Sequence, residues 1–190
     1  MFQRKDQVGA CAGGDIVGRD KQTNLTFDLR RSAGASKIEA LKVRLTAEME
    51  NDHQVGAIVE DLQRYHNRRR TPDGIEGLEA KLHAASRDYE IMDALEQKEQ
   101  FAKLLLKWSL YASAQEIFVH LLAIAVHEFR MSIQPLIGEL DRQGYNELVT
   151  SKIVRPLMDE VGDCPLSMDA VVTMGLYYWL AEQCFVRWHA

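Results

Sequence analysis

Apolar residues recur at spacings of three and four through residues 114–137, which is the period of one face of an α-helix. From Ile117 to Val126 the only polar residue is His120, so apolar surface covers most of the circumference, as is typical of a helix packed on several sides. The unbroken apolar run 121–126 is far shorter than the roughly 18–20 residues needed to cross a bilayer, so we expect a central core helix and no membrane span. The two predicted apolar stripes are Phe118, Leu122, Val126, Phe129, Ile133 and Leu136, and Ile117, Leu121, Ile124 and Met131.

Weaker helical patterns flank this segment on both sides. Ser36 has the capping-box spacing to Glu39, which indicates a helix start. Glu48 and Asp52 interrupt the apolar series that follows, so residues 36–66 form either one helix or two. The other predicted helical segments are 75–85 (a short helix or an ordered loop), 88–111, 145–161 and 168–188. This pattern predicts an all-α fold, a multi-helix bundle around the central apolar helix, formed by a single domain of residues 36–190.

The C-terminal helical segment has its own start signal and a glycine in its middle. Ser167 is a credible N-cap, with Asp169 in the first turn, where the helix dipole favours negative charge. Gly175 costs about 1 kcal/mol relative to alanine in a helix interior, so we expect it to permit a close helix crossing. The predicted apolar set of this segment is Val171, Val172, Leu176, Trp179, Leu180 and Phe185, and that of 88–111 is Met92, Leu95, Ala102, Leu105 and Leu106.

Two segments resemble each other, Ile133–Leu140 and Val154–Val161, each with proline as its third residue. Proline lacks an amide donor and clashes with the preceding turn, so Pro135 and Pro156 should each kink or restart a helix. Paired kinks would let two helices wrap one core, although chance similarity between amphipathic segments is an equal alternative.

Residues 1–35 lack a helical period and are rich in glycine. We expect a short extended or β arm there, which must pair with another copy, with the helical body or with a partner, because an isolated two-stranded ribbon is not stable. A flexible tail is the alternative. The candidate self-association or partner-binding residues in this arm are Gly14, Asp15, Ile16, Val17, Gly18, Arg19, Asp20 and Lys21.

Charge and cysteine usage limit the functional classes. Residues 1–37 carry seven basic and four acidic groups, a net charge of +3, which leaves −8 for residues 38–190. An acidic body argues against direct nucleic-acid binding, since phosphate contacts dominate that affinity. The three cysteines form no CxxC pair, and no apolar signal segment begins the chain, so we expect a cytoplasmic protein.

The sequence contains no complete catalytic motif. His127-Glu128 begins an HExxH pattern, but Met131 replaces the second histidine. A small metal-dependent hydrolase using Glu116, His120, His127 and Glu128 is geometrically possible, and a histidine paired with a neighbouring carboxylate is the competing interpretation. The segment 14–21 lacks the Gly-Lys-Ser/Thr of a phosphate loop, so no nucleotide, metal or other cofactor is predicted. The triple arginine 68–70 either lies in a solvated loop or contacts phosphate.

Four segments together resemble a known family. These are Gly-Asp-Ile-Val-Gly-Arg-Asp-Lys (14–21), Gly-Leu-Glu-Ala-Lys-Leu (77–82), His-Glu-Phe-Arg with Ile-Gln-Pro-Leu-Ile (127–137), and Cys-Phe-Val-Arg-Trp-His (184–189). The chain resembles the small helical components, of C-terminal-domain type, of bacterial ABC-three-component conflict systems. In these systems an SMC/Rad50-like ABC ATPase works with a middle component and a third component.

The resemblance implies a non-enzymatic subunit that couples the ATPase to an effector in defence against phage or mobile DNA. It implies self-association or docking through residues 14–21, and a structural or partner-facing role for His127, Glu128, Phe129 and Arg130. Related components often carry a fused effector domain. No residues are left over here for such a domain, so we expect any toxic activity to belong to a separate effector or middle-component chain.

Overall fold

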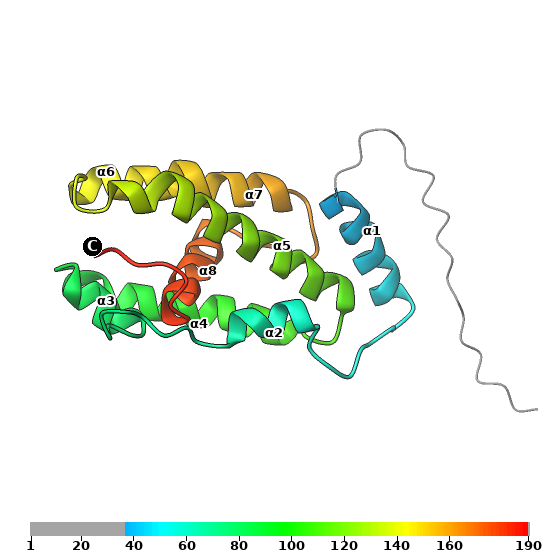
Figure 1. Cartoon of the computed structure of the whole chain (residues 1–190). Helices are drawn as coiled ribbons and strands as arrows, with labels where there is room; N and C mark the ends of the chain where they lie inside the picture. The colour runs from blue at the N-terminus through cyan, green and yellow to red at the C-terminus, as the bar shows by residue number, and fades with distance from the viewer. Residues whose placement is uncertain (1–36, 190) are drawn as a thin grey trace, which may run out of the picture. The chain divides into compact units, whose positions relative to one another are not determined.

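Residues 37–189 are described by the computed structural model, and within this range the chain is helical with no strand (Figure 1). The α-helices are α1 (Lys37–Glu50), α2 (Glu60–His66), α3 (Leu78–Ala84), α4 (Ile91–Lys107), α5 (Ala112–Glu128), α6 (Arg142–Val149), α7 (Arg155–Val161) and α8 (Ala170–Glu182). Two 3-10 segments, η1 (Asp88–Glu90) and η3 (Gln134–Leu136), and two π segments, η2 (Phe129–Ile133) and η4 (Thr150–Val154), adjoin them. The predicted all-α class is confirmed for this range. The predicted arm over 1–35, its Gly14–Lys21 element and the Ser36 cap lie outside the described residues.

The segment 36–66 contains two helices because α1 ends in a Schellman motif. Asp52 has a φ of +48°, and the amide of His53 donates a 2.8 Å hydrogen bond to the carbonyl of Glu48. Glu48, which interrupts the apolar series, has a tertiary partner: its carboxylate accepts hydrogen bonds from the amide (3.1 Å) and hydroxyl (2.7 Å) of Ser113 in the first turn of α5. The carboxylate of Glu48 therefore satisfies a backbone amide at the N-terminus of α5, which has no acceptor within its own helix.

The helix α5 is buried over most of its circumference, as predicted. Its buried residues are Ser113, Ala114, Gln115, Ile117, Phe118, Leu121, Leu122, Ala125 and Val126. The helical path continues through η2 and η3 to Leu136. The assignment of Met131 to an apolar stripe was wrong, because its side chain is 67% exposed. The wider π turn of η2 shifts the face that its residues present.

Both prolines of the repeated pattern follow a π segment. Pro135 comes after η2 and Pro156 after η4, each within the first two positions of the next helical segment. The ring of a proline clashes with the carbonyl four residues earlier, and a π turn, whose hydrogen bonds span five residues, accommodates this. The prediction that each proline kinks or restarts a helix is confirmed.

The helices α4 and α8 cross at Gly175, where a Cβ atom would lie 2.1 Å from the carbonyl oxygen of Gln97. Only glycine allows this approach, so the predicted close crossing is confirmed. Beside it, the ring of Phe101 contacts the rings of Phe118 and Trp179, each with centroids 5.9 Å apart. The helix α8 lies between α4 and the layer of α5, α6 and α7 (Figure 1). It therefore shares the central position that the sequence indicated for residues 114–137 alone.

The start of α8 differs from the prediction. Its N-cap is Asp169, whose carboxylate accepts a 2.8 Å hydrogen bond from the amide of Val172. Ser167 does not cap the helix, because its left-handed backbone (φ +49°) places it in the preceding turn. The exposed residues among the predicted apolar sets are Val171, Met92 and Leu106, which lie on helix surfaces that no other described element covers.

The helices α3 and α8 end in the same motif as α1. Ser86 and Cys184 occupy the left-handed position, with φ of +55° and +62°. The amide of Phe185 donates to the carbonyl of Leu180 at 2.8 Å, closing the turn after α8. Glycine usually marks this position, and its absence here explains why a helix was wrongly predicted as far as residue 188.

Candidate functional site

The C-terminal segment, residues 183–189, packs against the other family-like segments. Lys81 of α3 is almost completely buried, and its ammonium donates hydrogen bonds to the carbonyls of Ala181 and Val186, the latter at 3.2 Å. Burial lowers the pKa of Lys81. Segments 77–82 and 184–189, which are a hundred residues apart in sequence, are thus joined directly.

Glu182 forms a second connection at the end of α8. Its carboxylate accepts hydrogen bonds from the amide of Leu78 (3.0 Å) and the ammonium of Lys98 (3.3 Å), and it pairs with Arg68. Burial acts to raise the pKa of Glu182, but the Leu78 amide and the two cations outweigh it, and the pKa is lowered. A charged Glu182 therefore ties α3, α4 and the loop after α2 to α8.

Segment 127–130 joins this assembly through Phe129. The buried ring of Phe129 lies 6.4 Å from that of Tyr177, centroid to centroid. The hydroxyls of Tyr145 and Tyr177 are 2.7 Å apart, and Tyr145 donates to the carbonyl of Arg187 at 3.0 Å. Within segment 127–130, Phe129 is therefore a core residue that packs against α8. Its neighbours His127 and Arg130 are exposed and Glu128 is half-buried.

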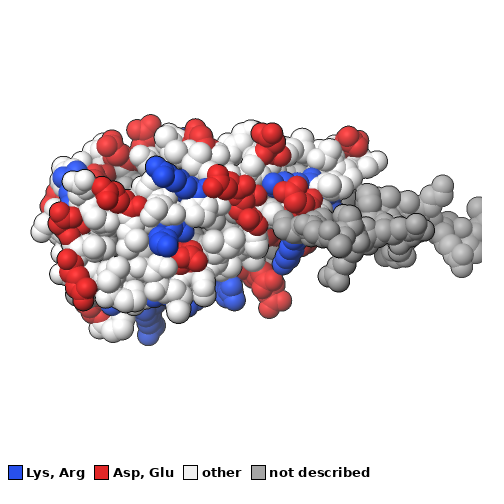
Figure 2. All heavy atoms as spheres, turned by 90° about the horizontal axis from the view of Figure 1, so that it is seen from above, with Lys and Arg blue, Asp and Glu red and all other residues white. Residues whose placement is uncertain are grey.

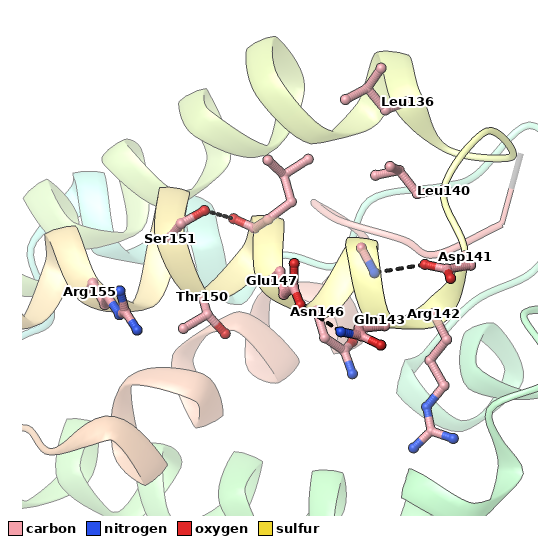
Figure 3. A pocket seen from close by; sticks show the side chains of 12 residues that line it. Leu136, Leu140, Asp141, Arg142, Gln143, Asn146, Glu147, Thr150, Ser151 and Arg155 are labelled. Carbon is pink, nitrogen blue, oxygen red and sulfur yellow. Dashed lines mark hydrogen bonds between the residues drawn. The ribbon is translucent and has the colours of Figure 1, made fainter.

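A groove of about 1040 Å³ opens to solvent along α6. Leu136 and Leu140, from the end of the α5 path and the loop after it, form one side, and residues of α6, η4 and α7 form the other (Figure 3). Its lining combines half-buried leucines with charged groups of both signs, including Leu136, Leu140, Leu148, Arg142, Glu147 and Arg155.

The α6 wall of the groove is held by a buried arginine. Arg87 forms two 2.9 Å hydrogen bonds to Glu90 and another to the side chain of Asn146. Burial acts to lower the pKa of Arg87, but the bonds and charge of Glu90 outweigh it, and the pKa is raised. Arg142 stacks on the ring of Tyr89 at 3.7 Å and lies 3.6 Å from Glu90. The groove therefore has a fixed wall.

Sequence reasoning missed the groove. Its residues come from several elements, and only Leu136 was singled out, as a core position. One local signal was present: Asp141 accepts a 2.8 Å hydrogen bond from the amide of Gly144 and so begins α6 (Figure 3).

The four residues of the metal-hydrolase hypothesis do not come together. Glu116 lies 3.4 Å from Arg44, and His120 lies 3.0 Å from Glu160 of α7. Glu128 accepts a 3.0 Å hydrogen bond from Ser132. Among residues 37–189, no group of three histidine, cysteine or acidic side chains is arranged to hold a metal ion. The competing interpretation, a histidine paired with a carboxylate, is confirmed for His120.

The family follows from residues 77–188. This range matches C-terminal domain 9 (CTD9) of the ABC-three component (ABC-3C) systems. The chain belongs to the CTD9 family. ABC-3C systems are bacterial conflict and defence systems, and membership in one implies partner components for CTD9. No curated protein and no solved structure matches the chain.

The CTD9 match contains Lys81, Glu182 and all of the groove, but not Arg68, which pairs with Glu182. It spans α3 to α8, whereas α1 and α2 precede it and pack on α5. The element Gly14–Lys21 also precedes the match.

Acidic groups predominate over basic ones on the face of the domain that carries α6 and α7 (Figure 2). This agrees with the net charge of −8 of residues 38–190. In the described part of the chain, no helix is long and apolar enough to span a membrane.

Proposed function

We propose that this CTD9 chain is a non-enzymatic interaction subunit that couples the SMC/Rad50-like ABC ATPase of its system to an effector. Membership in a three-component system supports the existence of partner proteins. The observation that carries the proposal is the groove along α6, which combines a leucine wall with a charged rim, the composition of a protein interface.

A protein segment suits this groove better than a small molecule. At about 1040 Å³, its volume reaches the upper end of the roughly 300–1,000 Å³ typical of small-molecule sites. It is open to solvent along its length, whereas small-molecule pockets enclose most of their ligand. An amphipathic helix or loop of the ATPase or of a middle component would place apolar side chains against Leu136 and Leu140 and polar ones against the rim.

Co-purification of the tagged full chain with the components encoded beside it tests this proposal. Leu140→Glu places a charge in the apolar wall and should abolish co-purification of the partner. The matched control is Met92→Glu, which introduces the same charge at an exposed apolar position of α4 outside the groove. Equal retention of the partner by both variants would exclude the groove as the contact.

We also propose that the chain self-associates through Gly14–Lys21. The support is the glycine-punctuated, β-prone sequence, because an extended segment presents unpaired backbone groups that favour pairing with another chain. Light scattering of the full chain and of a version starting at Ser36 checks this proposal. An oligomer that becomes a monomer on truncation supports it, and equal oligomeric states contradict it.

A further inference from the structure

Two arginines and two aromatic rings form a stack where α2 meets the C-terminal segment. The guanidinium carbon of Arg64 lies 5.0 Å from the ring centroid of Tyr65, and the rings of Tyr65 and Phe185 are 5.0 Å apart. The guanidinium carbon of Arg69 lies 3.9 Å from the ring centroid of Phe185. Cation–π and ring contacts therefore link Arg64 to Tyr65, Tyr65 to Phe185, and Phe185 to Arg69.

The guanidinium of Arg69 is oriented, but its N–H groups have no partner among residues 37–189. Its backbone is fixed by a 3.1 Å hydrogen bond from its amide to the carbonyl of Gln183. Within residues 37–189, its side chain makes no hydrogen bond or ion pair. Arg68, by contrast, pairs with Glu182. Because stacking occupies only the flat face of a guanidinium, the donor edge of Arg69 remains available to an oxyanion.

Further positive charge lies around Arg69. Burial lowers the pKa of Arg69, and the like charges of Arg130 and Arg64 lower it further. Arg70 and Arg130 are exposed and form no ion pair within the described range. We call Arg64, Arg69, Arg70 and Arg130 the arginine cluster. It collects unneutralised positive charge on an otherwise acidic body.

We propose that the arginine cluster binds a carboxylate-rich segment of a partner protein. A guanidinium fork pairs bidentately with a carboxylate, and an orientation already fixed by Phe185 reduces the ordering that binding requires. A nucleic acid offers the same oxyanion chemistry, but its long charged backbone would extend over the surface of a body with a net charge of −8. A short acidic peptide segment avoids this repulsion.

This inference goes beyond the proposed function, since it concerns a separate surface and its test requires neither the groove nor a partner component. The probe is fluorescein-labelled octaglutamate, titrated with the full chain at low ionic strength and followed by fluorescence anisotropy, with labelled octaserine as the neutral control. The test variant is Arg69→Gln/Arg70→Gln/Arg130→Gln. The charge-matched control is Lys103→Gln/Lys107→Gln/Lys152→Gln, which alters exposed lysines outside the arginine cluster.

We expect the cluster variant to bind octaglutamate about tenfold or more weakly and the lysine variant less than about twofold more weakly. Arg69→Lys, which keeps the charge but loses the planar fork, should give an intermediate loss. Equal losses in the cluster and lysine variants, or wild-type affinity in Arg69→Lys, would overturn the proposal. The proposal would also be overturned if the wild-type chain bound duplex DNA more tightly than octaglutamate and the cluster variant lost the DNA binding. That result would assign the arginine cluster to nucleic acid.

Discussion

The Cα of Gly175 in α8 faces the backbone carbonyl of Gln97 in α4 so closely that a Cβ atom would lie 2.1 Å from the oxygen. This crossing brings α8 into the centre of the bundle, where its C-terminal end contacts Leu78, Lys81 and Lys98.

Gly175→Ala should destabilise the domain. The added methyl group meets backbone that cannot move aside as a flexible side chain does, so overpacking of about 1–3 kcal/mol should exceed the roughly 1 kcal/mol gained in helix propensity. Chemical denaturation measures the change. Gly56→Ala is the control, because a Cβ there has no atom within 4 Å. Equal stability of the two variants would contradict the close crossing.

Ser86→Gly should leave stability unchanged or raise it by up to about 1 kcal/mol, because Ser86 has a φ of +55° at the end of α3, a conformation that glycine adopts without steric cost. Ala80→Gly, at an exposed position inside the same helix, should lower stability by about 1 kcal/mol. Thermal unfolding of both variants compares the two. A similar loss in both would mean that α3 does not end in a left-handed residue.

The ends of the helices show which parts of the fold could be predicted from the sequence and which could not. The apolar period predicted the helical segments and the buried face of α5, and Gly175 predicted the crossing, because both depend on local spacing. The break after α1 was one of two alternatives, and the predicted segment 75–85 ends within one residue of α3. The end of α8 was missed because Cys184 occupies a position that usually carries glycine.

The groove and the arginine cluster could not be predicted from spacing. Leu136 and Arg155 belong to different elements, η3 and α7, and both line the groove. Arg69 is likewise placed by the C-terminal segment, through Phe185 and the carbonyl of Gln183. Tertiary contacts decide both surfaces, and no local pattern encodes them.

Glu182→Gln should lower the free energy of unfolding by about 1–3 kcal/mol. The substitution weakens the hydrogen bonds that Arg68 and Lys98 make to this side chain, and both cations stay partly buried. The pKa of Glu182 is lower in the folded protein than in the unfolded chain, where it is near 4.5. The stability that the charged carboxylate contributes is therefore complete above pH 4.5 and is lost as the pH falls through the folded pKa. Denaturant titration at neutral and acidic pH measures this difference.

The control for Glu182→Gln is Glu99→Gln, which removes an exposed pair with Lys103 and should leave the stability nearly unchanged. If Glu182→Gln lowered the stability at neutral pH no more than Glu99→Gln does, the conclusion that Glu182 connects α3 and α4 to α8 would be wrong.

Tyr178→Phe should reduce the loss of stability at alkaline pH. Burial raises the pKa of Tyr178 to about 12, so between pH 10 and 12 the unfolded chain loses a proton that the native one keeps, which favours unfolding as pH rises. The variant should remove up to about 1.4 kcal/mol per pH unit of this dependence. Denaturant titrations across this pH range, on wild type and variant, make the comparison. Identical slopes would show that Tyr178 ionises normally.

The most direct test of the central claim is the mass, by light scattering, of the purified full chain mixed with the ABC ATPase component of its own system, with and without ATP. We expect a stable complex to form with the wild type and with Met92→Glu but not with Leu140→Glu. Separate masses for the two wild-type proteins under both nucleotide conditions would contradict direct coupling to the ATPase.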